Sequence, residues 1–584
     1  MIKSFCMNWK KYNWWLILII ALILRLWGYD KNPIGLVHDE IHQIVNAKSL
    51  LLTNREAAGT GAGIFNNLPY CDGNCVFGEL PSYLLVPFAI LPTVFPWVKL
   101  PFVLLSILMM YFGAKIFENI TNNKNIGLLV MLLMAINPWS VNFGRTAYEN
   151  LFCFTFYLLS LYLWTIKPIK IRNQILAIVS GFAASLSYFG AKPIFVPLMI
   201  VGLIYGWSIE KNNIKKYITM GMMIFILMIG YGIVLNNSVA GQRLVETKLL
   251  NNEIIAQVNE ERRMSLEIPV VRDIFVNKYT VLFKILLKKY FGGLSPNYLF
   301  NEGEQGYDHF MIANHAFLYL IDLPLILFGL YLLAKKHGRG LLFVLAIIFI
   351  LPITPTLSNY ASTYALRSGL TYPIMAGLSG VGIFCIWEML SKNKYKYWLM
   401  TILFLIYLIS LVNFLVMYWY RNPFERGVGF VFHEREVSKY INLIKENMIE
   451  GNIEVTTNTP VDVIYEYALF TGKINNKIFV ENMNEAIINS TYIVDGIKFS
   501  KLCPTTINNN SIYLWEREMN CVKEPNRLAR ISEPKDGGAR YFIPNEKLCT
   551  GINLGAYPFP RIISDFNIEK MNIKDFCTKW ISKP

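Results

Sequence analysis

Long apolar segments are the feature that most constrains how this chain can fold. Several of them approach the roughly 20 apolar residues that an α-helix needs to cross the hydrocarbon core of a bilayer. Of the 584 residues, 54% are hydrophobic and only 16% are charged. The sequence therefore predicts an α-helical, polytopic membrane protein.

Apolar runs and the loops between them predict about eleven membrane spans. The first is expected to be retained, because Arg25, Trp27 and Tyr29 follow it where a signal peptide has small residues for cleavage. The spans are expected near residues 14–27, 97–117, 126–142, 148–166, 174–190, 193–208, 217–235, 316–334, 341–357, 369–390 and 397–419.

Basic residues predict the orientation. With the N-terminus on the cytoplasmic side, every short basic loop also falls on that side, as the positive-inside bias requires. These loops contribute much of the net charge of +15, and the sequence has no nucleic-acid-binding motif, so we expect no nucleic-acid partner. Residues 80–96 carry four prolines, and counting them as a span would reverse every later loop. We expect them to form a helix or broken helix in the outer interface.

Three regions are predicted on the outer face: a first loop at 28–96, a second at 236–315 and the tail. The predicted domains are a transmembrane domain at 1–420 and an extracytoplasmic domain at 421–584. In the tail, "REVSKYINLIKEN" and "VDVIYEYALFTG" predict helices, and "NIEVTT", "KIFV", "TYIVDG" and "SIYLWERE" predict strands. This alternation is typical of a small α/β domain.

Cysteine positions agree with this topology. Cys6, Cys153 and Cys385 are expected to be cytoplasmic or intramembrane. An even number is expected outside, where disulfides form: Cys71, Cys75, Cys503, Cys521, Cys549 and Cys577. Cys71 and Cys75 can close a tight loop, and the last four allow three pairings.

The stretch "GLVHDEIHQ", residues 35–43, places two histidines four residues apart around two adjacent acids. A zinc site of the H-E-x-x-H kind needs Glu directly after the first histidine, where this chain has Asp39, and no third ligand follows nearby. A simpler interpretation is that Asp39 and Glu40 stabilise the positive end of a helix lying along the membrane surface. The functional interpretation makes one acid a general base for an incoming acceptor, while the other orients it or binds metal.

Cations predicted at the outer ends of the spans suit a phosphate leaving group. Snorkelling to headgroups is the simpler explanation for each alone, but their gathering on the side that the positive-inside bias should deplete favours a site for a lipid phosphate. The candidates are Arg145 with Glu149 in "NFGRTAYEN", Lys192 in "SYFGAKPIF", Arg367 in "YALRSGL", Arg243 in "GQRLVETK" and His315 in "ANHAF".

Several of these motifs resemble one known superfamily. "RLWGYDKNPIGLVHDEIHQIVNAKSLL", "GELPSYLLVPF", "NPWSVNFGRTAYEN" and "SLSYFGAKPIFVPL" are similar to the C-type (GT-C) glycosyltransferases, in particular to the branch of the protein O-mannosyltransferases and aminoarabinose transferases. The resemblance covers roughly residues 15–390 and not the tail. It implies a GT-C-like fold in the cytoplasmic membrane and transfer from a polyprenyl-phosphate sugar donor on the outer face, with inversion at the anomeric carbon.

The resemblance also implies roles for individual residues. Asp39 matches the catalytic acid of the family's "DE" pair, with Glu40 as its neighbour. Arg145 matches an arginine expected near the donor phosphate, and Lys192 falls where the family often has Arg. Arg367 matches a basic motif before the tenth span, which completes the predicted phosphate-binding set. His38, Glu149, Arg243 and His315 are candidate contacts to substrate or metal.

Alternatives remain open at this point. Related oligosaccharyltransferases hold a divalent ion, and Asp39, Glu40 and Glu149 offer oxygen ligands for Mg²⁺ or Mn²⁺. The acceptor classes that fit are a protein hydroxyl, a lipid or a cell-envelope glycan. A transporter or flippase of lipid-linked saccharides would use the same cations without chemistry, and the tail is alternatively a binding module anchored by the spans.

Overall fold

The computed structural model describes the chain apart from residues 1, 59–77, 211–213, 237–251, 266–268, 305–309, 313–314, 358–364, 392, 428, 522–527, 536, 555–562 and 584. Its contacts divide the chain into two compact units. The helical unit comprises Met1–Leu24, Leu105–Asn142 and Asn150–Phe414. The mixed unit comprises Arg25–Leu104, Phe143–Glu149 and Leu415–Pro584.

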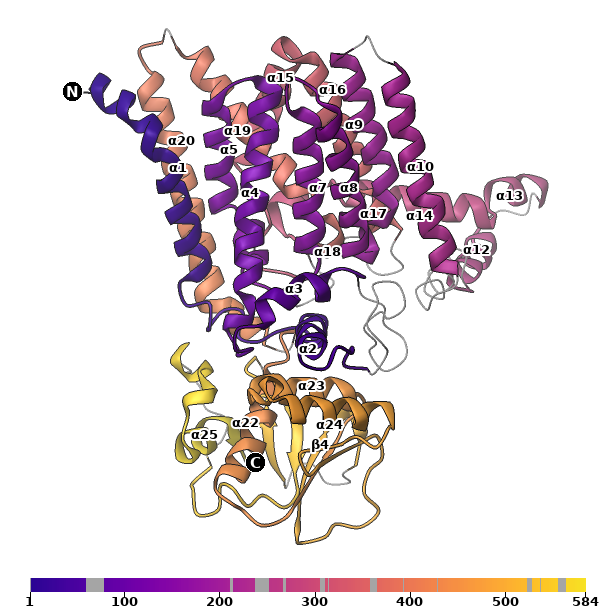
Figure 1. Cartoon of the computed structure of the whole chain (residues 1–584), viewed down its shortest axis with the longest axis vertical. Coiled ribbons are helices and arrows are strands. Elements are labelled where there is room, and N and C mark those ends of the chain that lie inside the picture. Colours follow the sequence, from indigo (N-terminus) through magenta and orange to yellow (C-terminus); the bar gives the residue numbers. More distant parts are fainter. Residues whose placement is uncertain are drawn as a thin grey trace. The chain divides into compact units, whose positions relative to one another are not determined.

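Each predicted span overlaps a helix of the structure (Figure 1). Six helical segments are long and apolar enough to cross a membrane, and three shorter apolar helices accompany them in the described residues. These segments confirm an integral membrane protein, while the count of eleven spans stays a prediction. The helices are α1 (Ile2–Leu26), α4 (Leu100–Thr121), α5 (Lys124–Ile136), α7 (Asn150–Thr165), α8 (Ile171–Ser187), α9 (Phe195–Ile209), α10 (Ile214–Asn236), α15 (Asp322–Lys336), α16 (Gly338–Ile350), α19 (Thr371–Met389) and α20 (Lys396–Val416).

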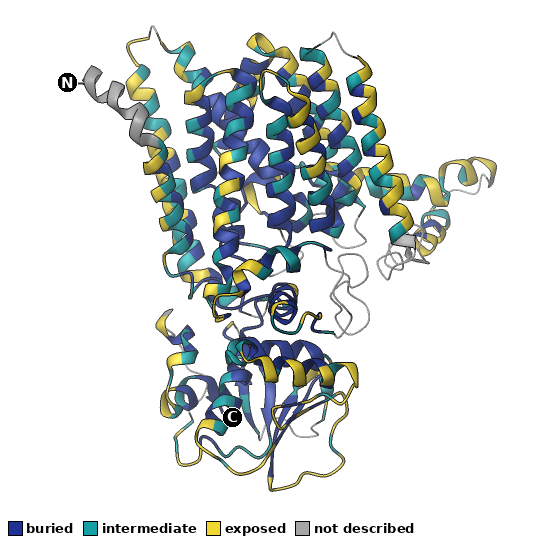
Figure 2. Ribbon diagram, viewed as in Figure 1, coloured by how far each residue is buried: buried dark blue, intermediate teal, exposed yellow. Residues whose placement is uncertain are grey.

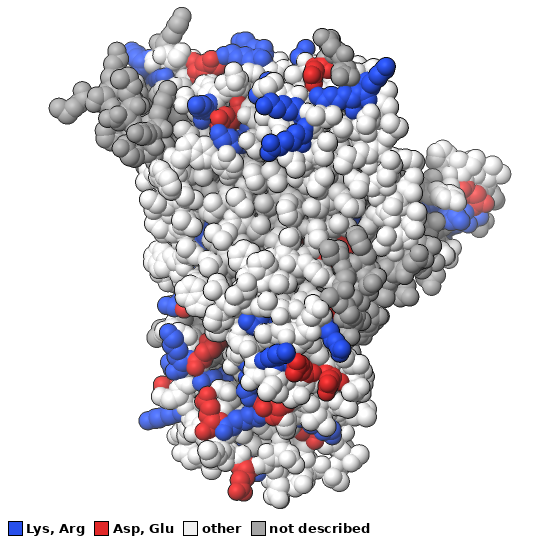
Figure 3. Space-filling model, viewed as in Figure 1, with Lys and Arg blue, Asp and Glu red and all other residues white. Residues whose placement is uncertain are grey.

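Within the helical unit, α19 lies in the interior and α20 at the surface: 72% of the apolar window is buried in α19, but only 11% in α20 (Figure 2). Small residues let α19 approach α15 closely, because a Cβ at Gly382 would lie 1.9 Å from the Leu325 oxygen. On the face shown in Figure 3, charged side chains gather at one end of this unit and its middle is almost uncharged. Such a surface suits surrounding lipid.

The mixed unit contains a seven-stranded sheet in the order β2-β3-β1-β4-β6-β5-β7. β1 pairs in parallel with β3 and β4, and the other pairs are antiparallel. The strands are β1 (Asn452–Thr456), β2 (Ile493–Val494), β3 (Ile497–Ser500), β4 (Ser511–Glu516), β5 (Ala529–Ser532), β6 (Ala539–Ile543) and β7 (Ile581–Ser582). The helices beside the sheet are α22 (Phe432–Glu446), α23 (Pro460–Phe470), α24 (Lys477–Ile488) and α25 (Ile573–Trp580).

The α/β architecture of the tail agrees with the prediction, but one element was assigned wrongly. "KIFV" was expected as a strand and instead opens α24. The Asn476 side chain accepts hydrogen bonds from the backbone N–H groups of Ile478 and Phe479, which caps the helix at this point. Two disulfides, Cys503–Cys521 and Cys549–Cys577, select one of the three pairings. Cys71 and Cys75 lie outside the described residues.

The first outer loop packs with the tail, which differs from the predicted boundary at residue 420. It contains α2 (His38–Thr53) and α3 (Pro81–Ala89), and the same unit includes the short segment 143–149. α2 packs against α3, α23 and α24. Residues 40–50 of α2 are buried without exception, so this helix is enclosed by protein instead of exposing a polar face.

Shorter helices complete the described elements. They are α6 (Pro138–Phe143), α12 (Asn252–Arg263), α13 (Pro269–Phe275), α14 (Lys278–Gly292), α17 (Ile353–Thr356), α18 (Ala365–Ser368), α21 (Asn422–Glu425) and the irregular turns η1 (Trp97–Lys99), η2 (Phe189–Ile194), η3 (Asn297–Asn301), η4 (Met417–Arg421), η5 (Lys473–Asn475), η6 (Arg517–Met519), η8 (Ile563–Phe566) and η9 (Ile568–Lys570).

Candidate functional site

The first turn of α2 separates the two adjacent acids into different environments. Asp39 is exposed, whereas Glu40 is fully buried. The Glu40 carboxylate accepts a hydrogen bond from the Val37 N–H at 2.9 Å and another from the Ala147 N–H at 2.6 Å. The first bond caps α2, and the second ties the segment 143–149 to this helix. Glu40 is therefore held in place by backbone hydrogen bonds, while the Asp39 side chain remains exposed.

Glu40 titrates far from its ordinary range. Burial raises its pKa to about 7, and the two backbone N–H groups oppose that rise. Asp39 contributes a further, smaller increase because two neighbouring negative charges repel each other.

His38 and His42 each meet a carboxylate of α23. The Nε2 atom of His42 lies 2.6 Å from Asp462 Oδ1, and the Nδ1 atom of His38 lies 2.8 Å from Glu466 Oε1. The partners are four residues apart on both helices, so two matched pairs form one turn apart. Both histidines of the opening motif therefore join α2 to the α/β region.

These contacts shift the pKa values of His38 and Asp462. Burial opposes protonation of His38, but the nearby carboxylate of Glu466, followed by Asp462 and Glu434, raises the pKa of His38 to about 10. Burial also acts on Asp462, yet the hydrogen bond and charge of His42 hold its pKa below the usual value. Glu434 is buried, which raises its pKa well above the ordinary range, and its Oε1 accepts a hydrogen bond from the Tyr541 hydroxyl at 2.8 Å.

Arg145, predicted at the donor phosphate, lies fully buried among backbone carbonyls. It donates to the carbonyl oxygens of Trp27, Gly28 and Asn32 at 2.8–3.0 Å. Its guanidinium also stacks 4.6 Å from the centre of the Trp419 ring. These contacts favour a structural role, in which Arg145 holds the segment that leads from α1 to α2.

Two of the carboxylates predicted as metal ligands accept hydrogen bonds from backbone N–H groups. Glu149 Oε2 accepts a hydrogen bond from the Gly78 N–H at 2.9 Å, and Glu40 accepts the two described above. Among the residues that the structure describes, no three His, Cys, Asp or Glu side chains form a group suited to a metal ion. The predicted set of Asp39, Glu40 and Glu149 therefore does not fit a divalent ion as it stands.

Within the helical unit, Lys192 and Arg367 belong to neighbouring elements. Lys192 lies on η2 and Arg367 on α18, and α17 packs against both elements. A Cβ at Gly190 of η2 would lie 2.9 Å from the Arg367 Nε, so the guanidinium rests against the turn that carries Lys192. Lys192 donates to the Tyr231 hydroxyl. Both cations are half-buried.

The same helical unit fixes the backbone around Arg367. The Thr354 hydroxyl donates to the Arg367 carbonyl at 2.8 Å, and the buried Glu304 accepts from the Ala365 N–H at 2.7 Å. His315 is half-buried, with Nδ1 2.6 Å from the Ala316 oxygen. Arg243 lies outside the described residues.

Sequence reasoning missed the carboxylates that meet the histidines. Asp462 and Glu466 were assigned only to a tail helix, although their four-residue spacing matches that of His38 and His42. It also missed Arg435, which is buried in the mixed unit and donates to Glu569 and to the Ile34 carbonyl. Lys99 is buried too, and donates to the Tyr29 carbonyl at 2.7 Å.

Comparisons with known proteins give distant structural likenesses. No protein-family model and no curated protein matches the chain. The structure is similar to ArnT from Cupriavidus metallidurans in the apo state, with 9% identity, a TM-score of 0.48, and coverage of 92% of this chain and 98% of ArnT. It is also similar to ArnT bound to undecaprenyl phosphate (11% identity, TM-score 0.47, coverage 92% and 97%). A third likeness is to the oligosaccharyltransferase of Archaeoglobus fulgidus in the apo form (11% identity, TM-score 0.44, coverage 92% and 75%).

With identities of 9–11% and TM-scores below 0.5, the roles of individual residues rest on the contacts given above.

Proposed function

We propose that this chain is a membrane glycosyltransferase that moves a sugar from a polyprenyl-phosphate donor to an acceptor on the outer face of the membrane. The proposal rests mainly on the different environments of the two adjacent acids in the first turn of α2. Glu40 is buried and bonded to backbone N–H groups, while the adjacent Asp39 is exposed at a helix end fixed on several sides. A positioned carboxylate of this kind suits a general base.

The proposed reaction is a single displacement. Asp39 accepts the proton of an acceptor hydroxyl or amine, and the freed electron pair attacks the anomeric carbon. The bond from that carbon to the phosphate oxygen breaks with inversion, and its electron pair leaves with the polyprenyl phosphate. No step requires an oxidant or a reductant.

The departing phosphate needs positive charge, which we assign to Lys192 and Arg367. Their half-buried positions on adjoining elements support this assignment, because cations stabilise a developing anion more strongly where water is excluded. Arg145 is assigned to hold the segment before α2, since its guanidinium donates to backbone carbonyls.

We place the α/β region and the acids of α2 outside the cytoplasm, with the N-terminus inside and the protein in the cytoplasmic membrane. Two disulfides in the α/β region support this orientation, because structural disulfides persist in oxidising compartments.

A reconstitution assay tests the proposal. Purified protein in proteoliposomes receives a polyprenyl-phosphate sugar labelled in the sugar, together with extracted envelope lipids, glycans and proteins. We expect the label to become covalently attached to an acceptor and unlabelled polyprenyl phosphate to be released. Movement of intact labelled donor between leaflets without any covalent product would identify a flippase instead.

A further inference from the structure

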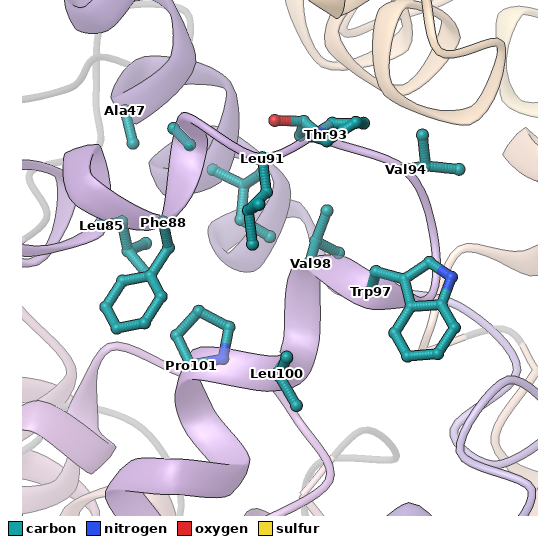
Figure 4. Close-up of a pocket in the computed structure, with 13 residues that line it drawn as sticks. Ala47, Leu85, Phe88, Leu91, Thr93, Val94, Trp97, Val98, Leu100 and Pro101 are labelled. Atoms are coloured by element: carbon teal, nitrogen blue, oxygen red, sulfur yellow. The ribbon is translucent and has the colours of Figure 1, made fainter.

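An apolar cavity of about 460 Å³ lies beside α2 in the mixed unit. Its walls come from α2, α3, the turn that follows α3 and the first turns of α4; they include Ile44, Ala47, Leu85, Phe88, Val98 and Pro101. In Figure 4 the side chains of Phe88, Leu91 and Pro101 face the same space. The volume falls in the range of pockets that bind small ligands, and the lining selects a hydrocarbon.

Polar contacts outside the cavity hold its walls in place. The buried Lys48 of α2 donates to the Ala89 carbonyl at 2.7 Å, which fixes the distance between α2 and α3. Asn475 forms two bonds with the backbone of Thr93: it accepts from the N–H at 2.7 Å and donates to the carbonyl at 2.9 Å. The cavity is therefore preformed.

The cavity lies where a membrane span begins. Trp97, one of its lining residues, opens the candidate span Trp97–Thr121. Apolar side chains around it are strongly exposed: Leu91 by 60%, Trp97 by 61% and the neighbouring Ile90 by 70%. A tryptophan at the start of a span is typical of the lipid–water interface. This exposed rim continues onto a helix that meets lipid, so the natural source of an occupant is the bilayer.

We propose that this cavity binds one acyl chain of a lipid acceptor, an inference that rests on the proposed transferase function. Ile44 and Ala47 follow Asp39 by five and eight residues on the same helix, or about 8–12 Å along its axis. A lipid held there by one chain keeps its polar end within reach of the exposed acid. At about 30 Å³ for each water-sized group, the cavity holds on the order of fifteen such groups, a size that suits an acyl chain and only part of a polyprenyl chain.

Photolabelling tests the occupant without depending on activity. Nanodiscs of full-length protein contain either a glycerolipid with a diazirine in one acyl chain or a polyprenyl phosphate with a diazirine in its chain. We expect the acyl probe to label residues 85–101, and Ala89→Phe and Val98→Phe to reduce that labelling at least fivefold. Leu104→Phe is the control, because it adds the same ring to exposed α4 surface outside the cavity. Labelling of these residues by the polyprenyl probe alone, or labelling unchanged by both cavity variants, overturns the proposal.

Kinetics then connect the cavity to the acceptor. We expect either cavity variant to raise the KM for a lipid acceptor at least fivefold while the KM for the donor and the melting temperature stay unchanged. An unchanged acceptor KM in both folded variants contradicts an acceptor site. Acyl labelling in a wild-type protein that transfers no sugar would instead contradict the transferase function and leave the chain-binding cavity established.

Discussion

His42 Nε2 lies 2.6 Å from Asp462 Oδ1, and this contact joins the helix that carries Asp39 to a helix of the C-terminal region. Both side chains are almost fully enclosed. One turn away, His38 and Glu466 repeat the same pairing. The two histidines that suggest a zinc motif in the sequence thus fix α2 on α23.

A double-mutant cycle tests this pairing. His42→Ala and Asp462→Ala should each lower the free energy of unfolding by about 1–3 kcal/mol, the cost of leaving a buried polar group without its partner. The double variant should lose less than the sum, because neither side chain is then left unpaired. Thermal unfolding of the full chain in detergent measures the coupling. Strict additivity would show that the two side chains do not interact in solution.

The His38–Glu466 pair should make stability depend on pH. Because the folded state raises the pKa of His38 from 6.5 to about 10, the stabilisation is fully present below pH 6.5 and is lost as the pH rises through 10. Wild type should therefore melt at a higher temperature than Glu466→Gln at pH 7, and the difference should shrink by pH 10.5. Glu485→Gln, an exposed change on α24, is the matched control. A difference that stays constant across this range would argue against a protonated His38.

Arg145 and Arg367 should respond differently to replacement by lysine. Arg145→Lys should lower the free energy of unfolding by roughly 2–3 kcal/mol, because an ammonium group cannot keep the geometry of bonds to three carbonyls. Arg367→Lys should leave the melting temperature within about 2 °C of wild type, since the side chain is only half-buried and lysine keeps its positive charge. Its transfer rate should fall at least tenfold if the guanidinium binds the leaving phosphate. A loss of transfer rate without a loss of stability in Arg145→Lys, together with a loss of stability in Arg367→Lys, would assign the phosphate to Arg145 and the structural role to Arg367.

The sequence was sufficient to predict features that depend on neighbouring residues. Apolar runs locate the helices of the membrane region because hydrocarbon requires an uninterrupted apolar segment. The helix starting at His38 and several elements of the tail follow from local periodicity and turn residues, whereas β3, β5, β6, β7 and α25 were not predicted. The prediction of a strand at "KIFV" was wrong because a four-residue apolar run fits either a strand or the first turn of a helix. The Asn476 side chain caps a helix at this point, which favours the helix.

Contacts between residues that are far apart in the sequence could not be predicted from local patterns. One of the two acids was expected to be the base and the other to orient it or bind metal, but the bond from the Ala147 N–H to Glu40 depends on how the segment 143–149 returns to α2. Arg145 was matched by motif to a phosphate site, while the carbonyls that it meets lie more than 110 positions earlier in the chain. The predicted domain boundary at residue 420 likewise separated α2 from α23 and α24, although these helices pack together.

Transfer by Asp39→Asn is the most direct measurement of the central claim. Asparagine keeps the size of the side chain but accepts no proton at neutral pH, so the rate from saturating labelled donor should fall about 10²–10⁴-fold. The dissociation constant of the donor should stay within twofold of wild type, and Asp39→Glu should recover part of the rate. A rate in Asp39→Asn equal to that of wild type, in folded protein at the same donor occupancy, would contradict the assignment of Asp39 as the base.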